Sequence, residues 1–246
     1  MDENEKTLLL DRTYECPICE HKAKSVKTSV AKFVETKADL RPIYSNINVT
    51  KYDTVCCNYC GYAALTKDFM NTTQVQRKLL REKIQANYKS HEEVVCDAYS
   101  TETAISRLKM ALLCTVTKAG KESEIGNICL KIDWLYQDLA DELDENNSDY
   151  ESKKENYLAE AHNFAMNAYE HLSKARMEES FPIAGMNETT LDYLLSYLGY
   201  VKGEYQTAMQ YLSGVVSTRG ISPRLKDKCL ELKELLNQKL HASADQ

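Results

Sequence analysis

Four cysteines near the N-terminus have the spacing of metal ligands. They form two C-x-x-C turns, C-P-I-C at Cys16–Cys19 and C-N-Y-C at Cys57–Cys60. Two residues between the cysteines let one tight turn present both sulfur atoms about 3.5–4 Å apart, as tetrahedral zinc requires. Gly61 follows the second turn, where the backbone must adopt a positive φ. The spacing therefore predicts one zinc ion bound by Cys16, Cys19, Cys57 and Cys60.

The predicted zinc is structural, because four thiolates leave no coordination position open for water. Two alternatives stay open. The C-P-x-C pair resembles a redox dithiol, although acidic Glu15 and Glu20 flank it and a second pair matches it. His21 is an alternative ligand in place of one cysteine. Cys56 is adjacent to Cys57, but the C-x-x-C spacing favours Cys57, and neighbouring residues of a strand point to opposite sides.

The segment that must position these cysteines, from Tyr14 to Gly61, has the pattern of β-structure. Val26, Thr28 and Val30 alternate with polar residues, which is typical of strands. So short a segment does not bury a stable apolar core, and domains of that size usually need a metal. The gap between the pairs exceeds the usual length of about 15–20 residues. We therefore expect the intervening residues to form a β-hairpin, as in an extended zinc ribbon.

A helical period begins near Met70, where apolar residues start to recur at three- and four-residue steps. Thr72 or Thr73 is the expected cap of the first helix. Its apolar face is expected to contain Val75, Leu79, Leu80 and Ile84. Further helices are expected from residue 101 and over residues 123–143, 152–175, 189–202, 205–217 and 222–240.

Small residues recur on these helices in a pattern that resembles tetratricopeptide repeats. The string G-E-Y-x-x-A-x-x-x-L, which begins at Gly203, is similar to the second half of such a repeat. The alanines that mark successive units, Ala104, Ala161 and Ala208, are 57 and 47 residues apart, whereas the repeat period is about 34 residues. We interpret the segment as degenerate repeats with insertions, and an irregular helical bundle is the alternative.

The expected fold class is α+β and mostly α. Residues 1–69 are predicted to form a zinc-ribbon-like head with a flexible N-terminal arm, and residues 70–246 a helical, tetratricopeptide-like domain. Only the second part is long enough to bury its own core. We therefore expect a chelator to unfold the head while most of the helical signal persists.

Composition limits the classes of function. The 246 residues are 43% hydrophobic and 28% charged, which is typical of globular proteins, and the net charge of -6 disfavours binding of nucleic acid through broad phosphate neutralisation. The chain has no stretch of about 20 apolar residues and no basic, apolar leader. We expect a cytoplasmic protein with reduced thiols. The sequence contains no P-loop, G-x-S-x-G or H-E-x-x-H motif.

Several short motifs together resemble an uncharacterised bacterial family known only as a domain of unknown function. They are C-P-x-C at Cys16–Cys19, R-P-x-Y at Arg41–Tyr44, Y-D at Tyr52–Asp53, C-x-x-C-G-Y-A-A at Cys57–Ala64 and F-P-x-x-G-M at Phe181–Met186. Asn58 stands where the family usually has proline. The resemblance spans nearly the whole chain and implies a metal-binding head with repeat-like helices. It implies no activity.

The leading hypothesis for function is a non-enzymatic scaffold. Stacked helical hairpins would bind a peptide or protein partner on a concave surface, and the zinc head would rigidify or extend that surface. Asn127 and Lys131, one turn apart on the first helix of a hairpin, are candidate contact residues, and a solvated helix face is the alternative. The sequence indicates no oligomeric state.

Two other functions stay open as alternatives. A ribbon that binds nucleic acid is suggested by the basic residues Lys22, Lys24, Lys27, Lys32, Lys37, Arg41 and Lys51, although few aromatic residues for base stacking lie among them. An enzyme would need a pocket between head and helices, near Arg41, Tyr44, Tyr52 and Asp53. We favour the interpretation that these residues hold the head onto the helices.

Overall fold

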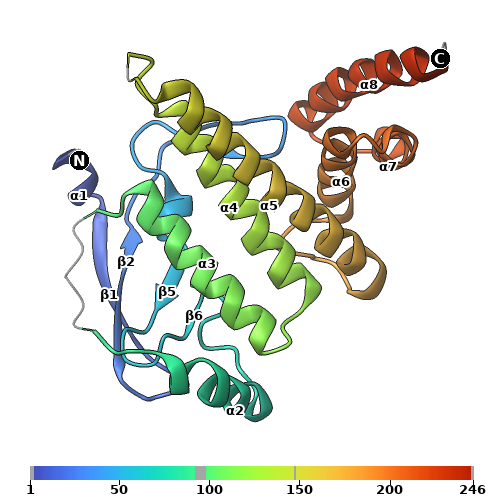
Figure 1. The fold of residues 1–246 in the computed structure, drawn as a ribbon. Helices are drawn as coiled ribbons and strands as arrows, with labels where there is room; N and C mark the ends of the chain where they lie inside the picture. Colours follow the sequence, from blue (N-terminus) through green and yellow to red (C-terminus); the bar gives the residue numbers. More distant parts are fainter. Residues whose placement is uncertain (1–2, 92–97, 147, 245–246) are drawn as a thin grey trace.

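The computed structural model describes residues 3–91, 98–146 and 148–244. A short helix α1 (Glu3–Lys6) precedes strands β1 (Leu9–Glu15), β2 (Lys22–Thr28), β3 (Phe33–Thr36), β4 (Pro42–Tyr44), β5 (Thr54–Cys56) and β6 (Ala63–Leu65), with a 3-10 turn η1 (Val49–Tyr52) before β5. Helices α2 (Gln74–Lys83), α3 (Thr101–Thr117), α4 (Glu122–Asp141), α5 (Tyr150–Glu178), α6 (Glu188–Lys202), α7 (Tyr205–Ser217) and α8 (Pro223–Ala244) follow (Figure 1). This arrangement confirms the predicted α+β, mostly α fold class.

The described strands pair into antiparallel hairpins, and each cysteine pair lies in the turn of one hairpin. The first pair connects β1 to β2, and the second connects β5 to β6. The residues between the two pairs contain the β3–β4 hairpin, as the long gap predicted. The β-structure therefore presents two cysteine turns, and an additional hairpin extends from between them.

Side-chain caps define the starts of several helices. Thr73 and Gln76 form a reciprocal capping box at α2, and Ser100 and Asn187 cap α3 and α6. The predicted apolar face of α2 is wrong at Val75, whose exposed fraction is 72%, whereas Leu80 is fully buried. The reason is that α2 packs against the rest of the protein through its C-terminal half.

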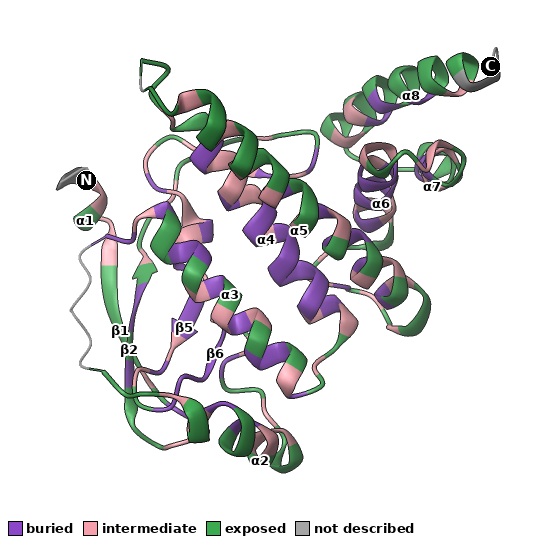
Figure 2. Ribbon diagram, viewed as in Figure 1, coloured by how far each residue is buried: buried purple, intermediate pink, exposed green. Residues whose placement is uncertain are grey.

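Helices α4 and α5 form a closely packed hairpin, and α6 and α7 form another. Figure 2 shows that α4 is buried along most of its length while α5 is exposed on its outer side. Close approach explains the small residues: a Cβ on Gly126 of α4 would lie 2.7 Å from the Leu172 side chain of α5. The predicted small-residue triplets, Ala104/Leu108/Ala111, Ala161/Ala165/Ala168 and Ala208/Leu212/Val215, are all buried.

One hydrophobic cluster extends across the predicted division between residues 69 and 70. It contains Ile18 and Leu65 from the hairpins, Leu80 from α2, Leu108 from α3 and Ile132 from α4. The head therefore shares this cluster with the helices, and a smaller cluster of Val26, Ile47 and Tyr52 with Tyr99 lies apart from it. None of the described helices is long and apolar enough to cross a membrane.

Candidate metal centre

The structure brings Cys16, Cys19, Cys57 and Cys60 together. Their sulfur atoms all lie within 4.8 Å of one another. The Sγ atoms of Cys16 and Cys60 are 3.6 Å apart, and those of Cys19 and Cys57 are 3.5 Å apart. These distances match the edges of a tetrahedron of sulfur around a metal with Zn–S bonds of about 2.3 Å. The four thiols therefore form a site that could hold a metal ion.

The first cysteine turn is closed by backbone hydrogen bonds. Cys16 N–H donates to the carbonyl of His21 (2.9 Å), and Glu20 N–H donates to the carbonyl of Cys16 (2.8 Å). Glu20 has a φ of 65°, which is the left-handed conformation that non-glycine residues rarely adopt. The turn thereby directs the backbone back into β2 immediately after the second sulfur.

The second turn repeats this geometry. Cys57 N–H donates to the Tyr62 carbonyl and Gly61 N–H to the Cys57 carbonyl, each at 2.8 Å. Gly61 has the predicted positive φ, 75°. It also lies against Tyr88, because a Cβ at this position would be 2.4 Å from the Tyr88 ring. Glycine is required here by two independent constraints, backbone conformation and space.

Burial and mutual hydrogen bonding shift the pKa values of the cysteine thiols in opposite directions. Cys16, Cys57 and Cys60 are almost fully buried, and Cys19 is partly exposed. Hydrogen bonds from Cys16, then from Cys60, lower the pKa of the Cys57 thiol. The hydrogen bond with Cys57, together with burial, raises the pKa of Cys16. The geometry thus favours a thiolate at Cys57, and thiolates are the form that binds metals.

Helices hold both cysteine turns from outside. Arg81 of α2 donates from Nε to the carbonyl of Ile18, at 2.9 Å. Cys114 of α3 receives the N–H of Ala63 at 3.4 Å and donates its thiol to the carbonyl of Gly61 at 3.6 Å. Burial raises the pKa of Cys114 to about 12, so it stays a neutral thiol. The sequence does not reveal this role of Cys114, because an isolated cysteine on a helix gives no signal of such contacts.

The other candidate ligands lie outside the group of four sulfurs. His21 hydrogen-bonds through Nδ1 to the Cys19 carbonyl at 3.0 Å, and its ring stacks on Tyr59 at 4.3 Å between centroids. Cys56 is the last residue of β5 and lines a cavity of about 480 Å³ together with Met110 of α3. The assignment of Cys57 in preference to Cys56 agrees with this placement and stays a prediction until variants are measured.

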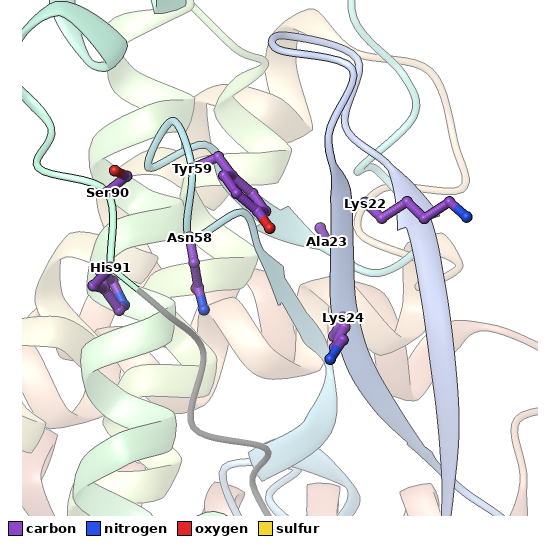
Figure 3. Close-up of a pocket in the computed structure, with 7 residues that line it drawn as sticks. All are labelled: Lys22, Ala23, Lys24, Asn58, Tyr59, Ser90 and His91. Atoms are coloured by element: carbon purple, nitrogen blue, oxygen red, sulfur yellow. The ribbon is translucent and has the colours of Figure 1, made fainter.

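A cavity of about 510 Å³ lies beside the second cysteine turn. Lys22 and Lys24 of β2 line it on one side, and Asn58, Tyr59 and His91 line the other (Figure 3). In the figure Tyr59 and Lys24 extend toward the space between the two sides, whereas Lys22 extends away from it. The cavity collects basic and aromatic groups, which are the types that contact an anionic or nucleic-acid ligand.

Two of the four residues considered for an enzyme pocket, Arg41 and Asp53, connect the head to helix α4. Arg41 donates to Asp138 at 2.6 Å and to Asp141 at 2.9 Å. Asp53 forms an ion pair with Lys131 at 2.9 Å. These contacts support the interpretation that the motif residues fix the head on the helices.

Tyr52 of η1 forms a hydrogen bond to the N-terminal helix α1. It donates to Glu5 at 2.8 Å and is nearly buried, with an exposed fraction of 4%. Of the two candidate contact residues on α4, Asn127 is buried and Lys131 forms an ion pair with Asp53, and contact of either with a partner stays a prediction.

Comparison with known proteins identifies the family of this chain, and the description of that family names no activity. A family model described as "Uncharacterized protein conserved in bacteria (DUF2225)" matches residues 9–236. The chain belongs to this family. The DUF2225 match covers both cysteine turns and extends into α8, which confirms the resemblance seen in the sequence motifs. No curated protein and no solved structure matches the chain, so the relation of this DUF2225 member to tetratricopeptide repeats stays a prediction.

Proposed function

We propose that the protein is a non-catalytic interaction scaffold. In this proposal one structural zinc ion joins the two cysteine turns, and the helical hairpins bind a peptide or protein partner. The observation that carries the proposal is the closed geometry of Cys16, Cys19, Cys57 and Cys60. Four thiolates satisfy a tetrahedral zinc completely, so the metal supplies folding energy and no reactive water.

Zinc fits the site better than other common metals for reasons of chemistry. Soft thiolate ligands in a tetrahedral arrangement favour zinc or iron, and a mononuclear site of four cysteines between two hairpin turns is typical of structural zinc. Such thiols require a reducing compartment, so we place the protein in the cytoplasm. Arg41 and Asp53 are held in ion pairs with α4, which supports a scaffold over an enzyme.

A ribbon that binds nucleic acid is the second candidate, and the cavity toward which Lys24 and Tyr59 extend favours it. Other basic residues of the head are neutralised: Lys37 pairs with Glu35, and Lys51 pairs with Glu5. A titration of labelled RNA and DNA at increasing salt would distinguish the candidates, because phosphate contacts weaken steeply with salt.

Metal analysis and partner capture together test the scaffold proposal. Purified protein is expected to contain one zinc per chain by inductively coupled plasma mass spectrometry. A zinc-loaded, immobilised protein is then used to capture partners from the native cytosol, with Cys57→Ser protein as the matched control. Specific recovery of a protein by the zinc-loaded form supports the proposal. Zinc-free protein that is fully folded, or folded bait that recovers no specific partner, contradicts it.

A further inference from the structure

The cavity beside the second cysteine turn has the size of a ligand pocket. Its volume is about 510 Å³, and ligand pockets typically measure about 300–1,000 Å³. One side is lined by Lys22, Ala23 and Lys24 of β2 (Figure 3). The other side is lined by Asn58, Tyr59, Ser90 and His91. None of these described lining residues is acidic, so the cavity favours an anionic ligand over a cationic one.

Lys24 supplies a cation that no described residue neutralises. On the β1–β2 hairpin it lies opposite the neutral Thr13, whereas Lys22 lies opposite the acidic Glu15. The ammonium of Lys24 forms no ion pair or hydrogen bond with any other residue that the structure describes. In Figure 3 the Lys24 side chain extends toward the cavity, and that of Lys22 extends away from it. Lys24 is therefore placed to meet one phosphate or other anionic group.

Tyr59 supplies a flat aromatic surface that is held in place before a ligand arrives. Its ring stacks on His21, with centroids 4.3 Å apart and an interplanar angle of 23°. His21 is in turn hydrogen-bonded to the Cys19 carbonyl. The exposed fraction of Tyr59 is 52%, so the ring face turned away from His21 is open to a ligand. A ring that is already ordered loses little side-chain entropy on binding, and every nucleobase has a π face that can stack on it.

Polar groups on the same side as Tyr59 can orient a ligand. The side chains of Asn58 and Ser90 line the cavity, and neither forms a hydrogen bond with another described residue. His91 is fixed to the cysteine turn, because its backbone N–H donates to the Asn58 carbonyl at 3.3 Å. Its Nδ1 lies 3.2 Å from the Tyr88 hydroxyl. A few placed polar groups of this kind give a ligand pocket its specificity.

The combination of these groups selects the class of ligand. An inorganic anion would use Lys24 and leave Tyr59 without a partner, whereas an uncharged ring would use Tyr59 alone. One cation matches one phosphate, and a long strand of nucleic acid needs a row of cations along its backbone. Lys37 and Lys51 are paired with acidic residues, and the net charge is -6. The cavity is therefore complementary to a single unit that carries both a flat ring and a phosphate.

We propose that this cavity binds one nucleotide unit. The base stacks on the open face of Tyr59, the phosphate contacts the ammonium of Lys24, and Asn58 and Ser90 hydrogen-bond to the base edge or the sugar. The unit is a free nucleotide or the end of a single strand, which share this chemistry. The inference goes beyond the scaffold function and does not rest on it, because the cavity lies on the head and not on the helical hairpins.

Two neighbouring lysines provide a matched pair of variants. Lys24→Gln and Lys22→Gln make the same change of charge on the same strand, but only Lys24 extends toward the cavity. Lys24→Gln should weaken nucleotide binding about tenfold or more through loss of a charge-assisted contact, and Lys22→Gln should leave it nearly unchanged. Tyr59→Leu keeps an apolar side chain but removes the π face, so it should also weaken binding about tenfold or more. All three side chains are exposed, so the core stays intact.

The probes separate the ring from the phosphate. They are the common ribonucleoside 5′-monophosphates, adenosine as a ring without phosphate, and inorganic phosphate as an anion without a ring. Each is titrated into zinc-loaded, full-length protein by isothermal titration calorimetry, with the fold checked by circular dichroism and the zinc content of every variant verified. At least one monophosphate should bind with one-to-one stoichiometry. Adenosine and inorganic phosphate should each bind about tenfold more weakly or worse, because each makes only part of the contacts.

Folded wild type that binds no monophosphate, or equal losses of binding in Lys24→Gln and Lys22→Gln, would overturn the inference. Adenosine or inorganic phosphate that binds as tightly as the best monophosphate would also overturn it, because one group would then suffice. A single-stranded oligonucleotide of about five nucleotides identifies the source of the unit. Tighter binding of the oligonucleotide indicates a strand end, and tighter binding of the monophosphate indicates a free nucleotide. Either result supports recognition of a ring together with a phosphate.

Discussion

Cys56 and Cys57 are adjacent in the sequence and lie in different surroundings. Cys57 has an exposed fraction of 1% and belongs to the group of four sulfurs. Cys56 is partly exposed, ends β5 and lines the cavity that also contacts α3. The alternation of side chains along a strand accounts for the difference, because consecutive residues point to opposite faces.

Serine substitutions at these two positions are expected to have unequal effects on metal content. Cys57→Ser removes a ligand of the tetrahedron, so zinc should be lost or bound far more weakly. Cys56→Ser leaves all four ligands in place and should retain one zinc per chain. Inductively coupled plasma mass spectrometry measures the zinc content per chain of the two variants. Equal zinc loss in the two would refute the ligand assignment.

Buried Asp133 predicts a pH dependence of stability. Burial raises its pKa to about 7, whereas an aspartate in the unfolded chain has a pKa of about 3.9. The folded state therefore holds this proton more tightly, and the contribution of Asp133 to the free energy of unfolding falls as pH rises from about 4 to about 7. At about 1.4 kcal/mol per pKa unit, the full effect reaches up to about 4 kcal/mol.

Asp133→Asn removes this dependence while keeping an oxygen that can accept from Gln137. Urea denaturation across pH 4 to 8 should show the variant gaining stability relative to wild type up to about pH 7, with a constant difference above it. Asp144→Asn is a control that should show no such change over this range, because hydrogen bonds from Asn146 lower the pKa of Asp144 and its contribution to stability is lost only below about pH 4. A wild-type to Asp133→Asn difference that does not vary with pH would contradict the expectation.

At the scale of elements, local sequence signals predicted the helices well. Helix α7 spans Tyr205–Ser217 as expected, and α6 begins one residue earlier than predicted. Periodicity and capping residues are local, so a single sequence contains the necessary information. The same holds for the cysteine turns, whose spacing encodes their geometry.

Contacts between distant segments were not predictable in this way. The segment around Leu40 lies against α6 and α8, at sequence separations of 155 residues for Ala38 with Tyr193 and 192 residues for Thr36 with Lys228. Pairings of this kind produce no periodic pattern in a single sequence. Val75 is an error of another kind. Local periodicity places it on the apolar face of α2, but periodicity gives no indication that the N-terminal half of this helix extends into solvent.

Substitution of Gly61 is expected to destabilise the protein more than substitution of another glycine with a similar positive φ. Gly61→Ala forces a non-glycine residue to a φ of 75° and places a Cβ 2.4 Å from the Tyr88 ring. Gly203→Ala is the matched control, because its φ is 88° and its Cβ would meet nothing within 4 Å. The control should lose about 1–2 kcal/mol of unfolding free energy, and Gly61→Ala about 1–3 kcal/mol more, from overpacking.

Urea denaturation of zinc-loaded protein measures both variants, and zinc affinity is measured in parallel by competition with a chromophoric chelator. Gly61→Ala should also bind zinc more weakly, because Gly61 N–H closes the turn onto the Cys57 carbonyl. Equal losses of stability in the two variants would show that contact with Tyr88 contributes nothing.

At the scale of the whole molecule, the shared hydrophobic cluster changes the expectation for metal removal. Sequence length alone suggested that the helices would keep their signal without zinc. Ile18, Leu65 and Phe69 of the head pack in the same cluster as α3 and α4, and Arg81 and Cys114 bind the cysteine turns directly. Loss of the metal should therefore expose apolar surface on these helices as well.

Treatment with EDTA is thus expected to lower both the helical circular dichroism and the thermal midpoint, and to keep unfolding as one cooperative transition. Added zinc should restore the signal, which controls for irreversible aggregation. A chelated protein that keeps nearly all of its helical intensity, and that proteases cut before residue 70, would instead establish the head and the helices as separate domains. That division of residues 1–69 from 70–246 stays a prediction until this measurement.

The contacts of Thr36–Arg41 with helices far along the chain have a consequence for the order of events during synthesis. The hairpin that carries this segment leaves the ribosome long before α6 and α8, whose Tyr193 and Lys228 hold it. Local helices form within microseconds, whereas contacts between ends of a long chain form slowly. Until α8 emerges, a nascent chain therefore leaves Leu40 without the complete apolar cluster of α6, α7 and α8 that packs against it, and the Thr36 carbonyl without its lysine donor. Incomplete burial of Leu40 at this stage favours aggregation of the nascent chain.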